Sequence, residues 1–381
     1  MIGVELISRL AQATKDSMHN NLVIFPTPKA EGKCTQVAQK TVTQYDDGER
    51  LFLELLATED LDAQLAKLAV EAREFEEVLR AAISAAYESG DGEEQAHLFL
   101  QRILYRINRL KLFWYDDLRL YSNERSLYLA SCQHEIEAAW QSWELGYVDI
   151  PALQQLNVKQ ALIDRAVEDL DPELSADSRY IREEMSLAGY CHLLAIASFD
   201  GLVEGSRLSR VLGGVANEVQ CTLVRVLLEE YGNGRLSRKH STFFAQMLAE
   251  LGMSTQPEGY FDLVPWEVLA CANQNFLTTE CKRYFLRYCG ALTYFEVAGP
   301  AAYKNYLAAA QRLLLSAAAM GYWDLHIRED ERHGRWMLDD VALPLAAQYA
   351  DDGWELVLGY DQEKIMSDRA AKAVVRSIRL R

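Results

Sequence analysis

Apolar residues recur at three- and four-residue intervals along most of this chain, which is the pattern of amphipathic α-helices. The first patterned stretch is rich in Ala, Leu and Glu, which favour helix, and Gly90-Asp91-Gly92 ends it. In this half of the chain the pattern predicts long helices at residues 50–88, 93–119 and 126–143, and a further helix that begins at Pro151. The chain is therefore predicted to be all-α.

Two segments interrupt the helical pattern. Residues 22–45 contain two prolines and a glycine among apolar residues, so we expect an extended or looped segment there. Residues 169–177 combine Pro172 with clustered acidic residues, which is typical of a boundary between domains. We therefore predict a helical N-terminal domain at residues 1–177 and a second helical domain at residues 178–381.

The second domain shows a dense series of helical patterns. Gly232-Asn233-Gly234 and Gly299-Pro300 are the sharpest predicted stops between them. The patterns predict helices near residues 179–199, 206–231, 236–252, 265–280, 281–298, 301–320, 322–342 and 363–378. This is the organisation of an all-helical bundle of about 200 residues.

The most specific chemical feature is a triplet formed by His326, Asp330 and His333. Spacings of four and then three residues put the three side chains on one face of a helix. Imidazoles and a carboxylate together suit iron, manganese or zinc. The alternative interpretation is a solvated polar face, because the surrounding segment is highly charged.

Three further ionisable residues lie on apolar helical stripes. Apolar residues occupy the positions one helical turn away from Glu230, His240 and Glu296, so these side chains are predicted to point inward. The neighbouring Glu229 aligns with polar residues, and we expect it to point outward and to be dispensable for metal binding. A carboxylate that points inward must be paired, protonated or bound to metal.

Together these residues supply three histidines and three carboxylates, enough for two metal ions with open positions for a small molecule such as O2. Each could instead be a satisfied polar group of the core. Glu94-x-x-His97 is a pair of the kind that ferritin-like diiron bundles use, but a single pair after Gly92 favours the start of a helix. The candidate metal ligands are Glu230, His240, Glu296, His326, Asp330 and His333.

Charge and cysteine usage exclude several classes of protein. Of the net charge of −17, −14 falls on residues 1–177, and such an acidic surface argues against nucleic-acid binding. No apolar run reaches about 18 residues and no secretory signal is evident, so neither a membrane span nor secretion is expected. Seven scattered cysteines without a CxxC pair predict reduced thiols in a cytoplasmic protein.

The candidate ligands resemble the haem-oxygenase-like diiron oxidases and oxygenases. The signature of that family is a Glu, a His in the next helical segment, a Glu, and then His-x3-Asp-x2-His, and the six candidates follow that order. The segment Glu229-Glu230-Tyr-Gly-Asn-Gly also looks like the one around the first two ligands, and the match covers roughly residues 178–381. The resemblance implies a haem-oxygenase-like bundle without haem, two iron ions and O2 as co-substrate. Residues 1–177 do not carry the resemblance, although some members are similar in having an additional helical N-terminal region that they use to form dimers.

The function predicted on this basis is oxygenation of a small amine or amino-acid-like molecule by a homodimeric diiron enzyme, with N-oxygenation favoured. The alternatives are oxidative C–C cleavage of an amino or fatty acid, a metal-free binding or cofactor-biosynthesis protein of the same fold, and a helical adaptor. We expect Glu229 or Glu329 to hold a substrate ammonium. The walls of the substrate pocket are predicted to include Tyr288, Tyr322, Met337 and Phe243.

Overall fold

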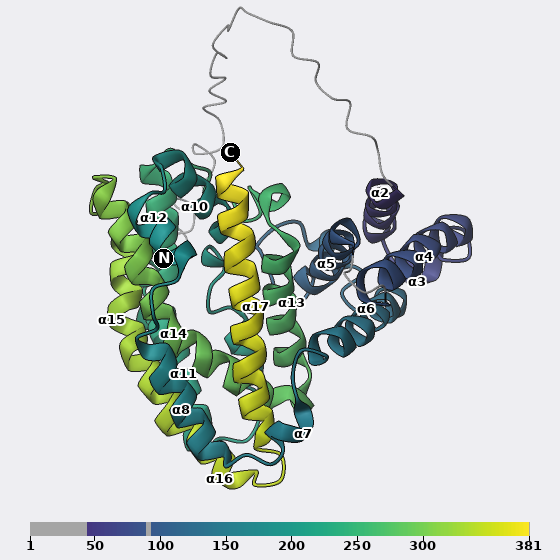
Figure 1. Ribbon diagram of the computed structural model, residues 1–381. Coiled ribbons are helices and arrows are strands. Elements are labelled where there is room, and N and C mark those ends of the chain that lie inside the picture. The colour runs from purple at the N-terminus through teal and green to yellow at the C-terminus, as the bar shows by residue number, and fades with distance from the viewer. Residues whose placement is uncertain (1–43, 89–92, 381) are drawn as a thin grey trace, which may run out of the picture. The chain divides into compact units, whose positions relative to one another are not determined.

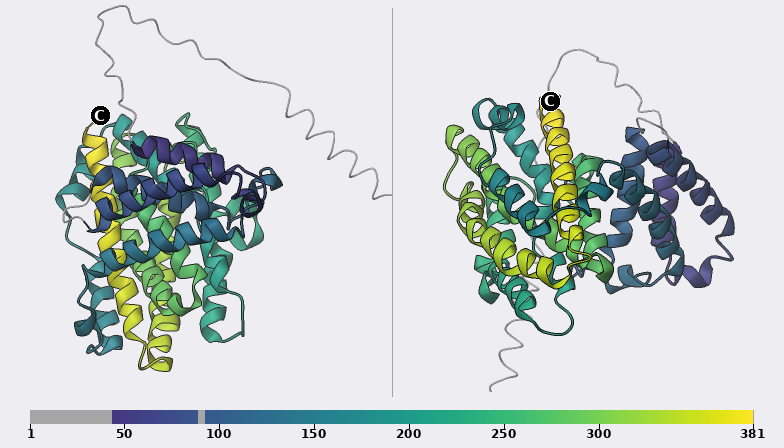
Figure 2. Two further views of the ribbon diagram at one scale, coloured as in Figure 1. Left: turned by 90° about the vertical axis from the view of Figure 1, so that its right-hand side faces the viewer. Right: turned by 60° about the horizontal axis from the view of Figure 1, so that its bottom comes forward.

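The computed structural model describes residues 44–88 and 93–380, and every regular element in these ranges is a helix. Residues 43–381 form one compact unit, shown in Figure 1 and from two further sides in Figure 2. The predicted all-α fold is confirmed. The predicted loop at residues 22–45 and the Gly90-Asp91-Gly92 break lie outside the described residues, apart from Gln44 and Tyr45, which begin a helix.

The first helices pack around an aromatic core that contains Phe52, Phe75 and Trp140. The predicted helices at residues 50–88 and 93–119 were too long, whereas the one predicted at residues 126–143 is confirmed. The 50–88 pattern is split by a turn in which Asp60 has a positive φ, and the buried Asn123 holds that turn through its side-chain amide. The elements are α2 (Gln44–Leu56), α3 (Leu61–Gln64), α4 (Ala69–Ile83), η1 (Ser84–Glu88), α5 (Glu94–Arg109), η2 (Leu118–Tyr121) and α6 (Leu127–Leu145).

The remaining elements surround α14 and α17, two long helices that pack against each other. Short segments precede and join the main helices: α7 (Ile150–Leu153), α8 (Val158–Leu170), α9 (Ala176–Glu183), η3 (Arg207–Val211), η4 (Gly232–Gly234), η5 (Leu236–Arg238), η6 (Phe261–Leu263), η7 (Lys282–Tyr284), η8 (Met337–Ala342) and α16 (Leu343–Gln348). The main helices are α10 (Leu187–Gly201), α11 (Glu218–Glu230), α12 (His240–Glu250), α13 (Trp266–Glu280), α14 (Phe285–Arg312), α15 (Gly321–Trp336) and α17 (Trp354–Arg379).

Three boundaries differ from the sequence prediction. Gly299-Pro300 does not end a helix, because α14 continues through Pro300 for another three turns. The 206–231 pattern is interrupted before Glu218, where the Asn217 side chain caps the start of α11. The last helix begins at Trp354 rather than near residue 363. The predicted stop at Gly232-Asn233-Gly234 is confirmed, since all three residues have positive φ.

Helices on the two sides of the predicted domain boundary at residue 177 contact each other. α5 packs on α13, and α8 packs on both α14 and α17. Buried amide side chains join these layers: Asn108 donates to Asn273 at 3.0 Å, and Gln141 donates to Gln274 at 2.7 Å. The division at residue 177 and the homodimer stay predictions. No helix among the described residues is long and apolar enough to cross a membrane.

Glycine allows the closest approach between α14 and α17. A Cβ atom added at Gly290 would lie 1.9 Å from the Leu356 carbonyl oxygen, and one at Gly359 would lie 1.9 Å from the Arg287 carbonyl oxygen. The two helices therefore cross backbone to backbone, and Figure 1 shows α17 running along the bundle beside α14 and α13.

Gly290→Ala is expected to lower the free energy of unfolding by about 1–3 kcal/mol, because the new methyl group must push the two helices apart. Urea denaturation of the variant and the wild-type protein measures this difference. Gly213→Ala is the matched control, since no atom lies within 4 Å of a Cβ at that position. Equal stability of the two variants would contradict the backbone-to-backbone packing.

Candidate metal centre

The structure brings all six predicted ligands into one buried cluster. Their exposed fractions run from 0% for His333 to 7% for Glu230. Glu230 comes from the end of α11, His240 from the start of α12 and Glu296 from the middle of α14. The triplet lies on one inward face of α15, as its spacing predicts. That these residues bind metal stays a prediction.

The local fold places Glu230 and His240 next to each other. The left-handed turn at Gly232-Asn233-Gly234 reverses the chain directly after α11, and a Cβ at Gly232 would lie 2.4 Å from the Arg238 carbonyl carbon. The turn therefore closes tightly, and α12 begins at His240. As a result, His240 Nδ1 lies 3.0 Å from Glu230 Oε2.

One group of potential ligand atoms combines Glu230 and His240 with His326 and Glu204. One atom from each residue lies within 4.8 Å of the others. His326 Nε2 is 3.1 Å from His240 Nδ1 and 2.8 Å from Glu204 Oε1. His326 Nδ1 faces the Tyr322 carbonyl oxygen at 2.9 Å and can donate to it, which leaves Nε2 free for a metal ion.

A second group combines Glu230, Glu296 and His333. His333 Nδ1 lies 3.4 Å from Glu296 Oε2, 3.6 Å from Glu230 Oε1 and 3.9 Å from Asp330 Oδ1. Glu230 is the residue common to both groups, with Oε2 toward His240 and Oε1 toward His333. If metal ions were bound, Glu230 would have one carboxylate oxygen available to each group.

Glu204 was not predicted from the sequence. It lies in the turn between α10 and η3, where no helical stripe exists to mark it as inward-facing. Its carboxylate nevertheless accepts a hydrogen bond from Tyr322 Oη at 2.8 Å and lies 2.8 Å from His326 Nε2. A seventh potential ligand thus comes from a turn, where apolar residues at helical spacing cannot mark a side chain as inward-facing.

Glu229 was predicted to point outward, but its carboxylate contacts α15. Glu229 is partly exposed, but its Oε2 lies 2.9 Å from His333 Nε2 and 2.6 Å from a terminal nitrogen of Arg332. The His333 ring therefore has Nε2–H donating to Glu229 and Nδ1 turned toward Glu230, Glu296 and Asp330. A carboxylate in this position would fix the ring orientation of His333 if that residue bound a metal ion.

The carboxylates raise the pKa values of the histidines among them. Burial alone would lower the pKa of His333, but Glu296 and Glu230 raise it to about 10. The pKa of His326 is raised well above its usual range against the effect of burial, chiefly by Glu204. Burial, and then Glu296, hold the pKa of Asp330 well above its usual range. The cluster therefore attracts positive charge, which protons supply when no metal ion does.

Several buried polar atoms in the cluster have no hydrogen-bond partner, which fits a metal site. They include Glu204 Oε2, both carboxylate oxygens of Asp330 and His333 Nδ1. Such atoms are rare in a folded core, because each loses its hydration without compensation. All of them face the same small volume and all are metal-ligand types. Mixed nitrogen and oxygen donors of this kind suit iron.

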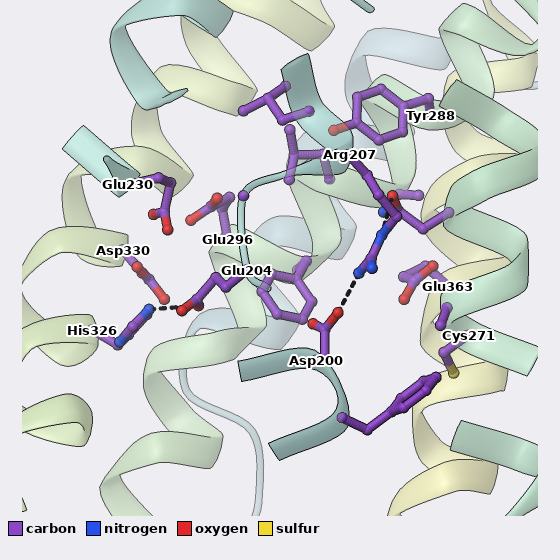
Figure 3. A pocket seen from close by; sticks show the side chains of 18 of the residues that line it. Asp200, Glu204, Arg207, Glu230, Cys271, Tyr288, Glu296, His326, Asp330 and Glu363 are labelled. Carbon is purple, nitrogen blue, oxygen red and sulfur yellow. Dashed lines mark hydrogen bonds and ion pairs between the residues drawn. The ribbon is translucent and has the colours of Figure 1, made fainter. Parts of the chain in front are cut away.

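A cavity of about 240 Å³ opens beside the cluster. Figure 3 shows Glu204, Glu230, Glu296, His326 and Asp330 on one side of it, with Asp200, Arg207 and Glu363 on the opposite side. Of the predicted walls, only Tyr288 lines the cavity. Glu229 and Glu329, predicted to hold an ammonium, are both bonded to Arg332 and do not line it.

The alternative pair Glu94 and His97 forms no metal site among the described residues. α5 begins at Glu94, so the interpretation as a helix start is correct. His97 stacks on Trp266 with ring centroids 4.4 Å apart, and burial lowers its pKa to about 4. It is a neutral aromatic residue of the core.

Residues 191–361 match the protein family described as iron-containing redox enzymes. Over 172 residues the chain is also 27% identical to a nitrosourea synthase of Streptomyces achromogenes subsp. streptozoticus. That alignment covers 44% of this chain and 36% of the nitrosourea synthase, so it concerns about a third of the relative's length. The family segment contains all six predicted ligands and Glu204.

Proposed function

Because residues 191–361 match the iron-containing redox enzymes, which are oxidoreductases, we propose that this protein is a non-haem diiron oxygenase that uses O2 to oxidise a small amine or amino-acid-like substrate. The observation that carries the proposal is the buried cluster of seven potential ligands, in which Glu230 belongs to both groups. Two adjacent sites with open positions suit the reduction of O2, a role that one structural metal ion cannot fill.

The residues of the cluster divide into two sites. Glu204, His240 and His326 would hold one iron ion, and Glu296, Asp330 and His333 the other, with Glu230 between them. Bound ferrous iron would supply electrons for the reduction of O2. The Tyr322 carbonyl group and the Glu229 carboxylate would fix the ring orientations of His326 and His333 by accepting their second N–H groups.

The cavity supports a small substrate. Phe199, Leu208, Leu292 and Phe295 give it apolar walls that limit the access of water to the cluster. N-oxygenation is favoured over other oxidations because the name of the similar protein, nitrosourea synthase, denotes a product with an oxidised nitrogen. Oxidative C–C cleavage of an amino or fatty acid is the second candidate, since a cavity of this kind also admits an alkyl chain.

The proposal is tested by reconstituting the protein with ferrous iron in the absence of oxygen and then adding O2 with candidate substrates. We expect about two iron ions per chain, as the two groups of ligands require. We also expect amines to accelerate O2 consumption, with ¹⁸O from labelled O2 recovered on nitrogen. Asp330→Ala, which removes a ligand, serves as the control with impaired iron binding.

Two results would contradict the proposal. Binding of a single zinc ion without uptake of iron would exclude the diiron centre. Oxidation of fatty acids alone, with loss of a carbon–carbon bond, would replace N-oxygenation by the cleavage reaction.

A further inference from the structure

The end of the cavity remote from the metal centre carries three charged side chains, Asp200, Arg207 and Glu363 (Figure 3). Two of them neutralise each other, because Arg207 donates to Asp200. Arg207 Nε also donates to Asn275 Oδ1 at 2.9 Å, and its guanidinium lies over the Phe276 ring. The Asp200–Arg207 pair is thus a fixed, neutral part of the wall.

Glu363 has no such cation. Among the described residues its carboxylate accepts one hydrogen bond, from Ser367 Oγ at 3.4 Å, and forms no ion pair. Two other acids of α17 are paired: Glu355 accepts from Arg287 at 2.8 Å, and Asp361 from Arg165 at 2.6 Å. Glu363 is therefore an acid of this helix that faces the cavity without a countercharge.

The charges along the cavity favour a cationic ligand. At the metal end, two Fe²⁺ ions would balance the four carboxylates of Glu204, Glu230, Glu296 and Asp330. At the remote end, Asp200 and Arg207 cancel, and one negative charge remains on ionised Glu363. Apolar side chains lie between the two ends, so no charged group of the walls between them neutralises Glu363.

We propose that Glu363 binds an ammonium or guanidinium group of the substrate, so that a second functional group of the same molecule faces the metal centre. This inference rests on the proposed function, which gives the metal end its role, and it adds the class of substrate. A cationic nitrogen held by Glu363 has no lone pair to offer and lies remote from the iron sites. The oxidised group is therefore the other end of a bifunctional, cationic substrate.

The affinity for such a substrate should depend on pH. Burial raises the pKa of Glu363 to about 7; Ser367 and Arg207 lower it and Asp200 raises it. The carboxylate, and not the carboxylic acid, attracts a cation. Binding should therefore strengthen as the pH rises through about 7 and weaken below it. The titratable and charged groups that interact with Glu363 are Asp200 of α10, Arg207 of η3, Cys271 of α13, and Tyr288 and Tyr294 of α14.

Cysteine and tyrosine do not account for a transition near neutral pH. Burial raises the pKa of Cys271 well above its usual range, and it also raises the pKa values of Tyr288 and Tyr294. Asp200 is paired with Arg207. A transition near pH 7 that disappears on Glu363→Gln therefore belongs to Glu363.

The test is calorimetric titration of the ferrous protein, without O2, with pentylamine, pentane-1,5-diamine and the neutral analogue pentan-1-ol. We expect the wild-type protein to bind either amine at least about tenfold more tightly than the alcohol at pH 8. Glu363→Gln should abolish this preference while leaving the affinity for pentan-1-ol unchanged. Asp368→Asn is the matched control, since Asp368 is an exposed acid on the same helix and does not line the cavity.

An unchanged preference for amines in Glu363→Gln would overturn the inference. A preference of the wild-type protein for amines that does not change between pH 6 and pH 8 would overturn it as well. Thermal melting checks that the variant is folded, and its response to pentan-1-ol shows that the cavity is intact. The same titration on metal-free protein separates the two proposals. If the protein prefers amines but takes up no iron, the diiron proposal is wrong and the role of Glu363 stands. If the protein takes up iron but does not prefer amines, only the role of Glu363 is wrong.

Discussion

Glu230→Ala is expected to remove nearly all bound iron from the protein. The two oxygens of Glu230 face different histidines: Oε2 lies 3.0 Å from His240 Nδ1, and Oε1 lies 3.6 Å from His333 Nδ1. Removal of this side chain takes a ligand from both sites. It also leaves the other three carboxylates of the cluster, Glu204, Glu296 and Asp330, without the residue that connects their two groups.

Iron analysis of the purified, reconstituted variant measures this effect. The matched control is Glu331→Ala, which removes an exposed acid of α15 whose ion pair with Lys304 spans 3.8 Å at the surface. The control should bind as much iron as the wild-type protein. Retention of one iron ion per chain in Glu230→Ala would show that Glu230 serves one site only. Circular dichroism establishes that both variants keep their helices.

The inward-facing residues were predictable because burying an ionisable side chain on an apolar stripe requires compensation. Glu230, His240 and Glu296 each follow that logic, and the structure places all three in the core. The i, i+4, i+7 spacing of the triplet likewise determines its common face once α15 is a helix. These inferences use local geometry alone, and local geometry is what a single sequence specifies best.

Residues in turns or near misplaced helix ends could not be found in this way. Glu204 lies in a turn, so its direction depends on how α10, η3 and α15 pack. Glu363 was hidden by a boundary error. A helix that begins at residue 363 would put this acid in the first turn, where the helix dipole favours it. The helix in fact begins at Trp354. The residues one turn away from Glu363 then include Tyr360 and Met366, which are both buried.

The error over Glu229 has a different cause. Its helical face is polar, as the sequence indicates, but that face lies against α15 rather than against water. Arg332 and His333 complete the polar contact from the other helix. Two polar faces can therefore neutralise each other between helices, and a helical wheel of one helix cannot distinguish this from solvation.

Glu229→Ala is accordingly expected to weaken iron binding and lower activity by about 10- to 100-fold, instead of leaving both unchanged. Without the carboxylate, His333 Nε2–H loses its acceptor at 2.9 Å, and the ring is no longer held with Nδ1 toward Glu230 and Glu296. Glu229→Gln should be milder, because the amide oxygen can still accept that hydrogen bond. Competition with a chelator measures the iron affinity, and O2 consumption measures the activity.

Glu329→Ala is the matched control for this comparison. Glu329 also accepts a hydrogen bond from Arg332, but it forms no hydrogen bond with His333, so its removal tests the effect of a lost partner for Arg332 alone. If the contact with His333 is what matters, Glu229→Ala should fall well below Glu329→Ala in iron affinity, with Glu229→Gln between them. Equal iron affinities for the two alanine variants would restore the original interpretation of Glu229 as a surface acid, and would leave the orientation of His333 to its packing against Trp336.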